Sequence, residues 1–575
     1  MFANANSVDD FSEIIVCAGA SPDSNRQPHP GLAEDLIDSG TAPAFKSELL
    51  HENLSSWHYT FSSRRFFAFY GAIFRRRSDR SDRSIMLELT NLSSTGKLTL
   101  GIALLMLVGG LILLGRLTSR SVVSESEFLI ADRKVPLLLS ILALLATWFG
   151  SSSVIESSSK MYQGGVSQVL LDPFACGATL ILTGLVFAGR FWNAKVATVA
   201  DLFRKEFGQS SERLSCVIQV PSFFLWIGSQ FLAMGQLLES TLDIPLWIAI
   251  LISAIVTLGI VIWGGMWTVT WANSVMILLS IASLLVLFVA TSLAIGQGDP
   301  LRGFLRVIET APDGHLKLDA SSPSKLLSIA SVLLIGLLGN VPGQDIQQRV
   351  ASAKTASTAR WMCIIAGMLY LLLGLVPLYL GLAARTKFGD RLQESELPIN
   401  QIAGLYLSQP FQILLVVGMF CLCLSVAAGA TLSQASIVSQ NLIKPLLGNR
   451  SASMWLVRSS VVIVIAGSLG VAYSGESIME LLELSLVIVL VSLFVPMAIA
   501  LFFPSSTPRP WVGIVSILTG FSAWLLGLWF EDSLSIPASL IGLLASALAG
   551  FLAMHRASRV HPRPSERLES PSDRG

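Results

Sequence analysis

Charged residues are scarce in this chain, and their scarcity excludes most classes of soluble protein. Asp, Glu, Lys and Arg make up 13% of its 575 residues, whereas 52% are hydrophobic. A soluble domain carries about 25% charged residues. The formal net charge is +1, so we expect no nucleic-acid partner. A composition this apolar predicts an all-α polytopic membrane protein whose partner is the lipid bilayer.

Cysteine is also infrequent, and the motifs of catalysis are missing. Five of the six cysteines lie in apolar runs, and none has the spacing of a metal site. They are best interpreted as small packing residues. The sequence contains no phosphate-binding loop, which argues against an ATP-driven pump. We therefore expect no enzyme, no catalytic residue, no cofactor and no metal site beyond a site for a transported ion.

Long apolar runs are what the chain has instead. A transmembrane helix needs about 20 mostly apolar residues. Thirteen segments meet this requirement: 98–115, 136–159, 166–189, 215–238, 245–263, 266–295, 325–342, 359–384, 410–442, 453–473, 477–503, 511–530 and 534–555.

Basic residues in the loops predict how these segments are oriented. With the N-terminus outside, the inward loops hold sixteen Lys and Arg and the outward loops hold eight. The excess belongs on the cytoplasmic side. We therefore expect a multi-pass protein of the plasma (inner) membrane with a cytoplasmic C-terminus. The polar tail 556–575 is predicted to be disordered and cytoplasmic.

The first 85 residues do not fit this scheme. They carry an arginine cluster that would have to lie outside, and they lack the pattern of a signal peptide. One hypothesis is that translation begins at Met86. The alternative is a disordered or interfacial extension over residues 1–85.

Two of the apolar segments are interrupted by Gly, Ser, Asn or Pro. The interruptions lie at 146–153 and 336–343, about 190 residues apart. Unpaired backbone groups are tolerated at membrane depth only where they line a cavity. Two interrupted helices in corresponding halves are typical of secondary transporters built from inverted repeats.

The order of several short stretches resembles the sodium:solute symporter family, which includes proline, pantothenate and sodium–glucose symporters. The resemblance runs from about Glu127 to Phe503. The stretches that carry it are 128–133 (FLIADR), 146–150 (ATWFG), 264–269 (GGMWTV), 342–349 (PGQDIQQR), the serine-rich helix around Ser425, and 480–483 (ELLE).

The resemblance implies a core of ten helices in two inverted groups of five, of the leucine-transporter type. The two groups would be residues 136–295 and 325–503. The helix at 98–115 would precede the core, and two helices within 511–555 would follow it. Thirteen helices with the N-terminus outside is also the arrangement of the proline symporter branch.

By the same resemblance, a sodium ion would bind at the first interruption. The ligands would be the backbone carbonyls of Ala146, Phe149 and Leu422 and the hydroxyl of Ser425, with Asn273 near the ion. Two residues depart from the family pattern: Val426 replaces a hydroxyl residue, and Asn273 stands where many members have Asp. Both departures weaken a cation site. Ser425 could alternatively bond a carbonyl of its own helix, and Asn273 could serve as an interhelical hydrogen bond.

Further polar or aromatic residues near the two interruptions are candidates for solute binding or gating: Trp148, Ser151, Ser153, Glu156, Gln230, Gly336, Asn340 and Gln344. Glu156 could replace the missing charge, bind a cationic solute or carry a proton, or it could meet water beside Lys160. Asp172 is interpreted as a helix cap or a gate, and Arg349 as a loop anchor or an inner gate.

Together these features predict a secondary active transporter that couples sodium to a small polar solute, such as an amino acid, a sugar or a carboxylate, by alternating access. The alternatives are an uncoupled or proton-coupled facilitator and a transporter-fold solute sensor. We expect a monomer, with an oligomer left open.

Overall fold

The computed structural model describes residues 92–119, 122, 124–392, 397–447, 454–474, 478–534 and 536–560. All of them belong to one compact unit, residues 61–575. The predictions for residues 1–85, including the start at Met86, lie outside the described residues.

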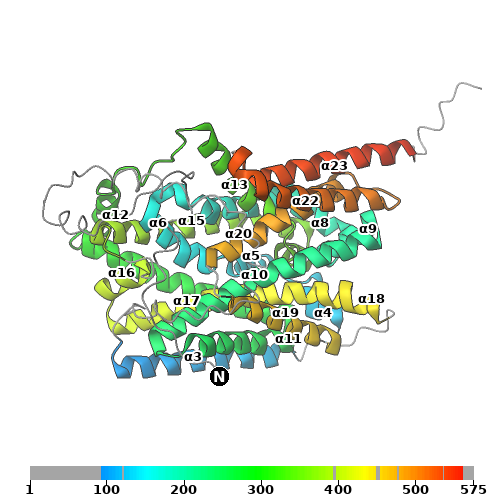
Figure 1. Ribbon diagram of the computed structural model, residues 1–575. Helices are drawn as coiled ribbons and strands as arrows, with labels where there is room; N and C mark the ends of the chain where they lie inside the picture. The colour runs from blue at the N-terminus through cyan, green and yellow to red at the C-terminus, as the bar shows by residue number, and fades with distance from the viewer. Residues whose placement is uncertain are drawn as a thin grey trace, which may run out of the picture. The chain divides into compact units, whose positions relative to one another are not determined.

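The first half of the described chain is a series of helices with several π-helical stretches, and its main helices can be followed in Figure 1. In order they are α3 (Ser94–Ser119), α4 (Glu125–Ile130), η1 (Ala131–Arg133), α5 (Leu137–Trp148), η2 (Ser152–Glu156), α6 (Ser157–Gly164), η3 (Gly165–Gln168), η4 (Leu170–Ala175), α7 (Cys176–Leu182), η5 (Thr183–Phe187), α8 (Ala188–Ala194), α9 (Val199–Phe207), α10 (Gln209–Leu242), α11 (Leu246–Ile295) and α12 (Pro300–Glu309).

The second half continues in the same way, and the described residues contain no strand beyond an isolated bridge between Val135 and Ala353. Its helices are α13 (Pro323–Gly339), α14 (Gln344–Ser352), α15 (Ala356–Phe388), α16 (Pro398–Tyr406), α17 (Gln409–Ile437), η6 (Val438–Ile443), α18 (Lys444–Leu446), α19 (Met454–Ala472), α20 (Ile478–Val489), η7 (Leu490–Phe494), α21 (Val495–Phe502), α22 (Pro510–Leu534) and α23 (Ala538–Val560).

Capping residues fix where several of these helices begin. Ser124 and Glu127 form a reciprocal capping box at the start of α4, and Thr198 and Asp201 form another at α9. Such a pair satisfies two backbone N–H groups that the first turn leaves without partners. The sequence therefore sets these helix starts locally.

Eleven of the described helices are long and apolar enough to cross a membrane, or twelve if the bent pair of α5 with η2–η3 counts as one crossing. One of the eleven is α11, whose 50 residues contain a non-helical Gly265 with φ 54° and ψ −132°. A Cβ there would collide with the backbone of Phe128, so glycine is required. Fifty helical residues rise about 75 Å, more than twice the hydrocarbon core. The predicted number of thirteen crossings stays a prediction.

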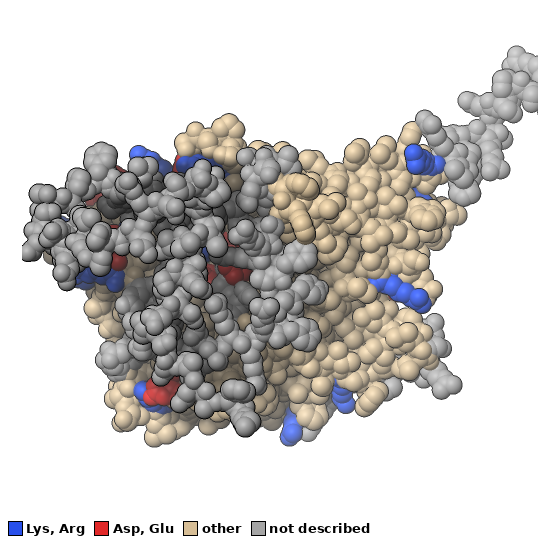
Figure 2. Space-filling model, viewed as in Figure 1, with Lys and Arg blue, Asp and Glu red and all other residues tan. Residues whose placement is uncertain are grey.

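The outside of this unit is apolar over wide areas. Large exposed side chains include Leu105, Met106, Trp247, Trp511 and Leu548. On the face shown in Figure 2, residues without charge dominate the described surface, and Lys and Arg lie toward its edges. An apolar surface of this extent suits lipid rather than water. The protein is a multi-pass membrane protein.

Helix α17 forms the centre of the helical core and is the most buried of the candidate spans. It packs against α11, α10, α19, α5 and α14. Helices α22 and α23 instead pack mainly on each other, as Figure 1 shows. Helix α23 ends at Val560, so its last residues lie within the segment 556–575 that the sequence predicts to be a tail. The rest of that tail lies outside the described residues.

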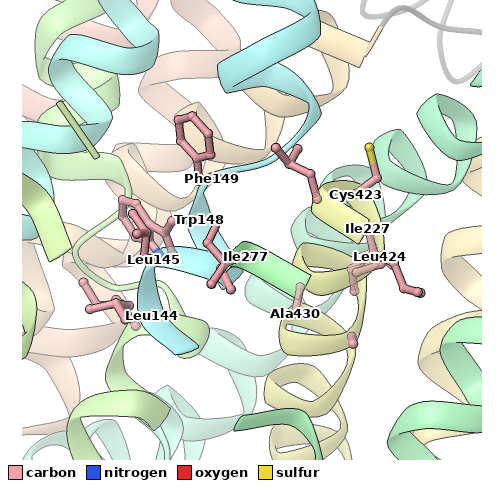
Figure 3. Packing of buried hydrophobic residues seen from close by; sticks show 14 of the residues in the cluster. Leu144, Leu145, Trp148, Phe149, Ile227, Ile277, Cys423, Leu424 and Ala430 are labelled. Carbon is pink, nitrogen blue, oxygen red and sulfur yellow. The ribbon is translucent and has the colours of Figure 1, made fainter. Parts of the chain in front are cut away.

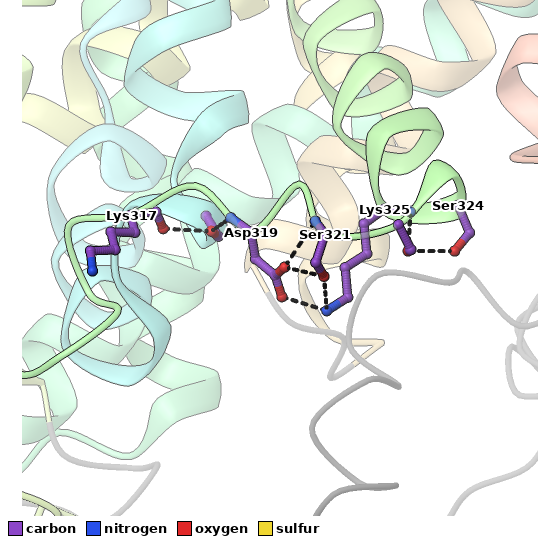
Figure 4. Close-up of polar contacts among 7 residues, drawn as sticks. Lys317, Asp319, Ser321, Ser324 and Lys325 are labelled. Carbon is purple, nitrogen blue, oxygen red and sulfur yellow. Dashed lines mark hydrogen bonds and ion pairs between the residues drawn. The ribbon is translucent and has the colours of Figure 1, made fainter.

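Hydrogen bonds connect the loop before α13 to η3, at the end of the bent pair that begins with α5. Ser167 on η3 donates to the carbonyl of Lys317 and accepts from the amide of Asp319, at 3.2 and 3.1 Å. Asp319 also accepts from Ser321 and pairs with Lys325, as Figure 4 shows. These two partners lower the pKa of the exposed Asp319 carboxyl to about 2. The loop thus links the two halves of the chain.

Candidate functional site

The first helix interruption lies where the sequence predicts it. Helix α5 ends at Trp148, Phe149 has φ −77° and ψ 91°, and the chain bends by 65° before η2 begins at Ser152. Gly150 is required by close approach, since a Cβ would lie 2.9 Å from Val426 and 3.2 Å from the Gln230 oxygen. Figure 3 shows Trp148 and Phe149 at this turn, near Ile277 and the chain of α17. The backbone here leaves the helical pattern among buried residues.

Oxygen atoms from three helices converge beside this interruption. The Ser425 hydroxyl is 2.7 Å from the Ala146 carbonyl and 2.9 Å from the Leu422 carbonyl. Asn273 Nδ2 donates to the Ser425 carbonyl at 3.1 Å and to Thr147 Oγ1 at 3.2 Å. The structure therefore brings together four of the five residues that the resemblance implies for sodium.

The fifth residue, Phe149, lies next to this cluster in the chain. Its extended ψ turns its carbonyl away from the axis of α5. Its buried ring packs edge-on against Tyr370, with centroids 5.5 Å apart. Val426, the residue that lacks the family's hydroxyl, is buried and faces Gly150.

Asn273 carries a buried polar atom without a partner in the described part of the chain. Its side chain is fully buried, and its Oδ1 has no hydrogen-bond partner among the described residues, although its Nδ2 has two. An unpaired buried acceptor costs about 1–3 kcal/mol. A cation in the cluster would accept electron density from this oxygen and remove that cost.

A buried arginine, which the sequence analysis interprets as a loop anchor or an inner gate, lies on the other side of Thr147. The Arg349 guanidinium donates to Thr147 Oγ1 at 3.1 Å and to Thr270 Oγ1 at 3.3 Å. Arg349 is 3% exposed, and Asp345, one helical turn earlier, interacts with it electrostatically. The i, i+4 spacing of these two charges was the signal available in the sequence.

Trp148 joins this charged pair to the first interruption. Its Nε1 donates to Asp345 Oδ2 at 2.6 Å, and its side chain is buried. The indole therefore holds α5 against α14, where the sequence predicts a residue that stacks on solute or closes the pocket.

Ser151 and Gln230, two residues predicted to bind solute or act in gating, contact each other just after the bend. The backbone amide and the hydroxyl of Ser151 both donate to Gln230 Oε1, at 3.3 and 3.1 Å. Gln230 Nε2 in turn donates to Ser229. Gln230 on α10 thus fixes the first residue after the interruption.

Ser153 and Glu156 lie on η2 and have different surroundings. Ser153 is buried and contacts Asp172 Oδ2 at 3.0 Å and Tyr370 at 2.6 Å. Glu156 is partly exposed. The helix does not end there, since α6 continues to Gly164. Asp172 does not cap a helix, and its carboxyl oxygens lie within hydrogen-bond distance of hydroxyl groups on η2 and α15.

The second interruption is shorter than the sequence predicts. Residues 336–339 are helical, and the chain leaves the helix only between Gly339 and Gln344. Asn340 Nδ2 bonds back to the Gly336 carbonyl at 2.9 Å and contacts Cys176. Thr179 on α7 donates to the same carbonyl at 2.6 Å. Gly336 and Asn340 therefore face α7.

Gln344 does not face the first interruption. Its side chain accepts from the amide of Val199 at 2.8 Å and donates to Ala197 and Ser436, which ties α14 to α9 and α17. Nearby, Gln348 donates to the Leu129 carbonyl at 2.8 Å, and Trp192 donates to that of Ala353 at 2.9 Å. These contacts close the bundle at the α14 end.

Comparison with known proteins agrees with this architecture. Residues 128–505 match the family model described as "Sodium:solute symporter family". The chain is 22% identical to the high-affinity choline transporter 1 of Drosophila melanogaster over 394 residues, which cover 65% of this chain and 61% of that protein. It is 26% identical to the sodium/glucose cotransporter of Vibrio parahaemolyticus over 271 residues, covering 45% of this chain and 50% of that one. The match thus spans about half to three fifths of these relatives.

Two solved structures share the fold. A Na⁺-coupled sialic acid symporter in a substrate-bound outward-open state superposes with a TM-score of 0.66 at 13% identity, over 80% of this chain and 98% of that one. Mhp1, a nucleobase-cation-symport-1 family transporter in a closed conformation, superposes with a TM-score of 0.53 at 14% identity, over 76% and 97%. Both likenesses concern the fold, which is that of the leucine-transporter type. Since the family model covers more than half of its residues, this chain belongs to the sodium:solute symporter family.

Proposed function

We propose that this protein is a secondary active transporter of the plasma membrane that couples sodium entry to uptake of a small polar organic solute by alternating access. The observation that carries the proposal is the buried oxygen cluster at the first interruption, which includes Asn273 Oδ1, an atom without a hydrogen-bond partner among the described residues. A cation bound in the cluster would supply that partner.

Sodium would bind where Ser425 now bridges two carbonyls. In the cluster, the Ser425 hydrogen is shared with Ala146 and Leu422, which lie on different helices. A sodium ion would take the lone pairs of these oxygens, of Asn273 Oδ1 and of the Phe149 carbonyl. Binding would therefore tie the first interruption to α17, and its loss would free them. This is the differential interaction that alternating access requires.

Two features would make this sodium site weaker than one with a carboxylate. Asn273 brings no negative charge, and the Arg349 guanidinium shares Thr147 Oγ1 with Asn273. Asp345 offsets the guanidinium charge in part. We therefore expect sodium activation at higher concentrations than in relatives with Asp at this position.

The solute would bind on the opposite side of the bend, toward Ser151, Gln230 and Trp148. Ser151 and Gln230 are polar and uncharged, which favours a neutral or zwitterionic polar compound. The relatives named for choline and for glucose give the first compounds to test. A gating role would fall to Gly336, Asn340 and Gln344. Near the second interruption, each of them forms a hydrogen bond with another group of the protein, through its backbone or its side chain. Ser153 and Glu156 would respond to movement of η2.

Uptake of labelled choline, glucose, amino acids and carboxylates into proteoliposomes, with and without an inward sodium gradient, tests the proposal. Uptake that requires sodium supports symport. Uptake without any gradient dependence would indicate a facilitator, and solute binding without uptake would indicate a sensor.

Ser425→Ala sharpens this experiment. Removing one sodium ligand is expected to weaken sodium activation by roughly tenfold, about 1.4 kcal/mol. Ser433→Ala is the matched control, because Ser433 lies on the same buried helix and bonds only the Ala430 carbonyl of its own turn among the described contacts of its hydroxyl. Equal sodium dependence in both variants would contradict the assigned site.

A further inference from the structure

Asp172 is a buried carboxyl group that the sodium site does not use. It lies on η4, is 2% exposed, and has φ −135° and ψ 123°, so its backbone is not helical. The hydroxyl of Ser157 donates to its backbone carbonyl at 2.9 Å. These features hold its side chain toward the residues that follow the first interruption.

Three hydroxyl groups surround this carboxyl. Oδ2 contacts the hydroxyls of Ser152 and Ser153 at 2.8 and 3.0 Å, and Oδ1 contacts the hydroxyl of Tyr370 at 2.8 Å. The Tyr370 and Ser153 hydroxyls are also 2.6 Å apart. Asp172, Ser153 and Tyr370 therefore form a closed ring of three contacts, which we call the Asp172 ring.

Counting hydrogens shows what this ring requires. Each hydrogen bond needs one hydrogen between its two oxygens, and Ser153 and Tyr370 carry one hydroxyl hydrogen each. An ionised carboxylate carries none. With Asp172 ionised, one of the three contacts would bring two lone pairs together within hydrogen-bond distance. A proton on the carboxyl supplies the third hydrogen and closes the ring in one direction.

The electrostatic surroundings point the same way. Among the described residues, no Lys, Arg or His forms an ion pair with Asp172, and the groups acting on its side chain are Tyr370, Ser152 and Ser153. An isolated charge within a transmembrane bundle costs several kcal/mol, whereas a neutral carboxylic acid avoids that cost.

Among the described residues, no charged side chain of the elements that pack on η4 forms an ion pair with Asp172. Helix α13 carries Lys325, which pairs with Asp319, and α15 carries Arg385, which pairs with Asp390. The other charged residues of the elements packed on η4 are Arg360 and Lys387 on α15 and Glu156 on η2. The titratable groups that face Asp172 are Tyr370 on α15 and Cys176 on α7.

We propose that Asp172 is a proton-binding site that is closed by the Asp172 ring and opened by movement of η2 against α15. Ser152 and Ser153 follow the 65° bend directly, so any change of that bend displaces two of the three hydroxyls. When the ring opens, the carboxyl O–H bond breaks, the proton passes to water, and a carboxylate remains that water solvates. The proposal rests on the proposed transport cycle only for that movement; the proton site itself does not.

Infrared spectroscopy of the purified protein in lipid tests the site without any solute. We expect the carbonyl band of a protonated carboxyl group at neutral pH in the native protein and its loss in Asp172→Asn. Ser433→Ala should leave the band unchanged. Tyr370→Phe, which removes one ring partner, should shift the band, and it serves as the second variant if Asp172→Asn does not fold. A native protein without such a band, or a band that survives Asp172→Asn, would overturn the proposal.

Uptake measurements then separate this inference from the proposed function. Native uptake should change between pH 5 and 8 at fixed sodium, and Asp172→Asn, which keeps a hydrogen donor in the ring, should lose that dependence. If the protonated-carboxyl band is present but no solute is taken up, the transport proposal is wrong and the proton-site proposal stands. If Asp172→Asn changes the sodium dependence and the native protein lacks the band, Asp172 binds a metal cation instead of a proton.

Discussion

The two helix interruptions look alike in the sequence but satisfy their backbone groups in different ways. At the first, the hydroxyl of Ser425 on another helix donates to the Ala146 carbonyl. At the second, amide side chains donate to the carbonyls: Gln347 to Val341 and Gln219 to Pro342, both at 2.7 Å. Each turn also has a buried amide oxygen without a hydrogen-bond partner among the described residues, Asn273 Oδ1 at the first and Gln347 Oε1 at the second. Local bonds from Gly343 to Asn340 and from Val341 to Leu338 complete that turn.

This difference assigns different roles to the two turns. Carbonyls that already accept hydrogen bonds from amides would coordinate a cation poorly, because the cation would have to displace those donors. The second turn is therefore best suited to hold α13 and α14 in a fixed arrangement. The first turn has oxygens whose partners a cation can replace, and it adjoins the Asp172 ring. Similar residues thus produce an anchor in one half and, in the proposed function, an ion site in the other.

The largest expected effect concerns Arg349, which connects the two interruptions. Arg349→Met removes a buried guanidinium and leaves Asp345 without its charged neighbour. Leaving one partner of a buried charge pair should lower stability by about 3 kcal/mol. Thermal denaturation of purified protein, followed by size-exclusion chromatography, measures this. Arg213→Met, at an exposed position on α10, is the control. Equal melting of both variants would mean that water reaches the guanidinium.

Restoring a charge at the first interruption should strengthen the ion site. A unit charge about 4 Å from a cation contributes up to ~4 kcal/mol at an effective dielectric constant of about 20, before desolvation. We expect Asn273→Asp to lower the sodium concentration for half-maximal uptake by roughly tenfold, about 1.4 kcal/mol. Asn340→Asp makes the same change at the second interruption and should give no such gain. A similar gain in sodium affinity from Asn273→Asp and Asn340→Asp would contradict the different roles assigned to the two turns.

Removing an amide from the second interruption should affect stability and leave sodium dependence unchanged. Gln219→Leu leaves the Pro342 carbonyl without its donor inside the protein. The expected loss is about 1–3 kcal/mol, measured by the same denaturation assay. Gln236→Leu, at a half-buried position on the same helix, is the control. A change in sodium activation without a loss of stability would show that the second turn also serves the ion.

The smallest effect is expected in the loop that links the two halves. The pKa of Asp319 is lowered to about 2 by Lys325 and Ser321, so its contribution to stability is present above the unfolded pKa of about 4 and is lost as the pH falls toward 2. Asp319→Asn should remove this acid-dependent component and change little at pH 7, because the pair is exposed. Asp313→Asn, in the same loop, is the control for denaturation scans across this range. An unaltered acid profile in Asp319→Asn would refute the assignment.

Several features followed from local patterns in the sequence. Apolar runs predicted the helices, and the Gly and Ser residues within 146–153 predicted the first bend, because such residues have low helix propensity. The second bend was placed too early, since Gly336 and Gly339 pack closely against Leu171, Ala175 and α20 within a continuing helix. Glycine serves both breaks and close packing, and local sequence does not separate the two uses.

The site was predicted unevenly for a similar reason. Ser425 and Asn273 were singled out through the family resemblance, and Ser425 contacts Ala146. The contact of Asn273 with Thr147 was not predicted. Arg349 was interpreted as a loop anchor or an inner gate and Asp172 as a helix cap or a gate, and the burial of both groups in the bundle was not predicted. Partners on other helices offset the free-energy cost of burying these groups. Local sequence does not predict which residues of other helices will be near.

By itself, the sequence determined that this chain folds into membrane-spanning helices and where the segment 136–159 bends, because lipid exposure, helix period and backbone breaks are properties of short segments. The order of its short motifs indicated the family. Which polar groups meet was decided only by the tertiary structure. Ser425 and Ala146 are 279 residues apart, and Asp172 and Tyr370 are 198 apart. Contacts at such separations depend on how whole helices pack, and that packing places an oxygen cluster and a carboxyl ring on either side of one bend.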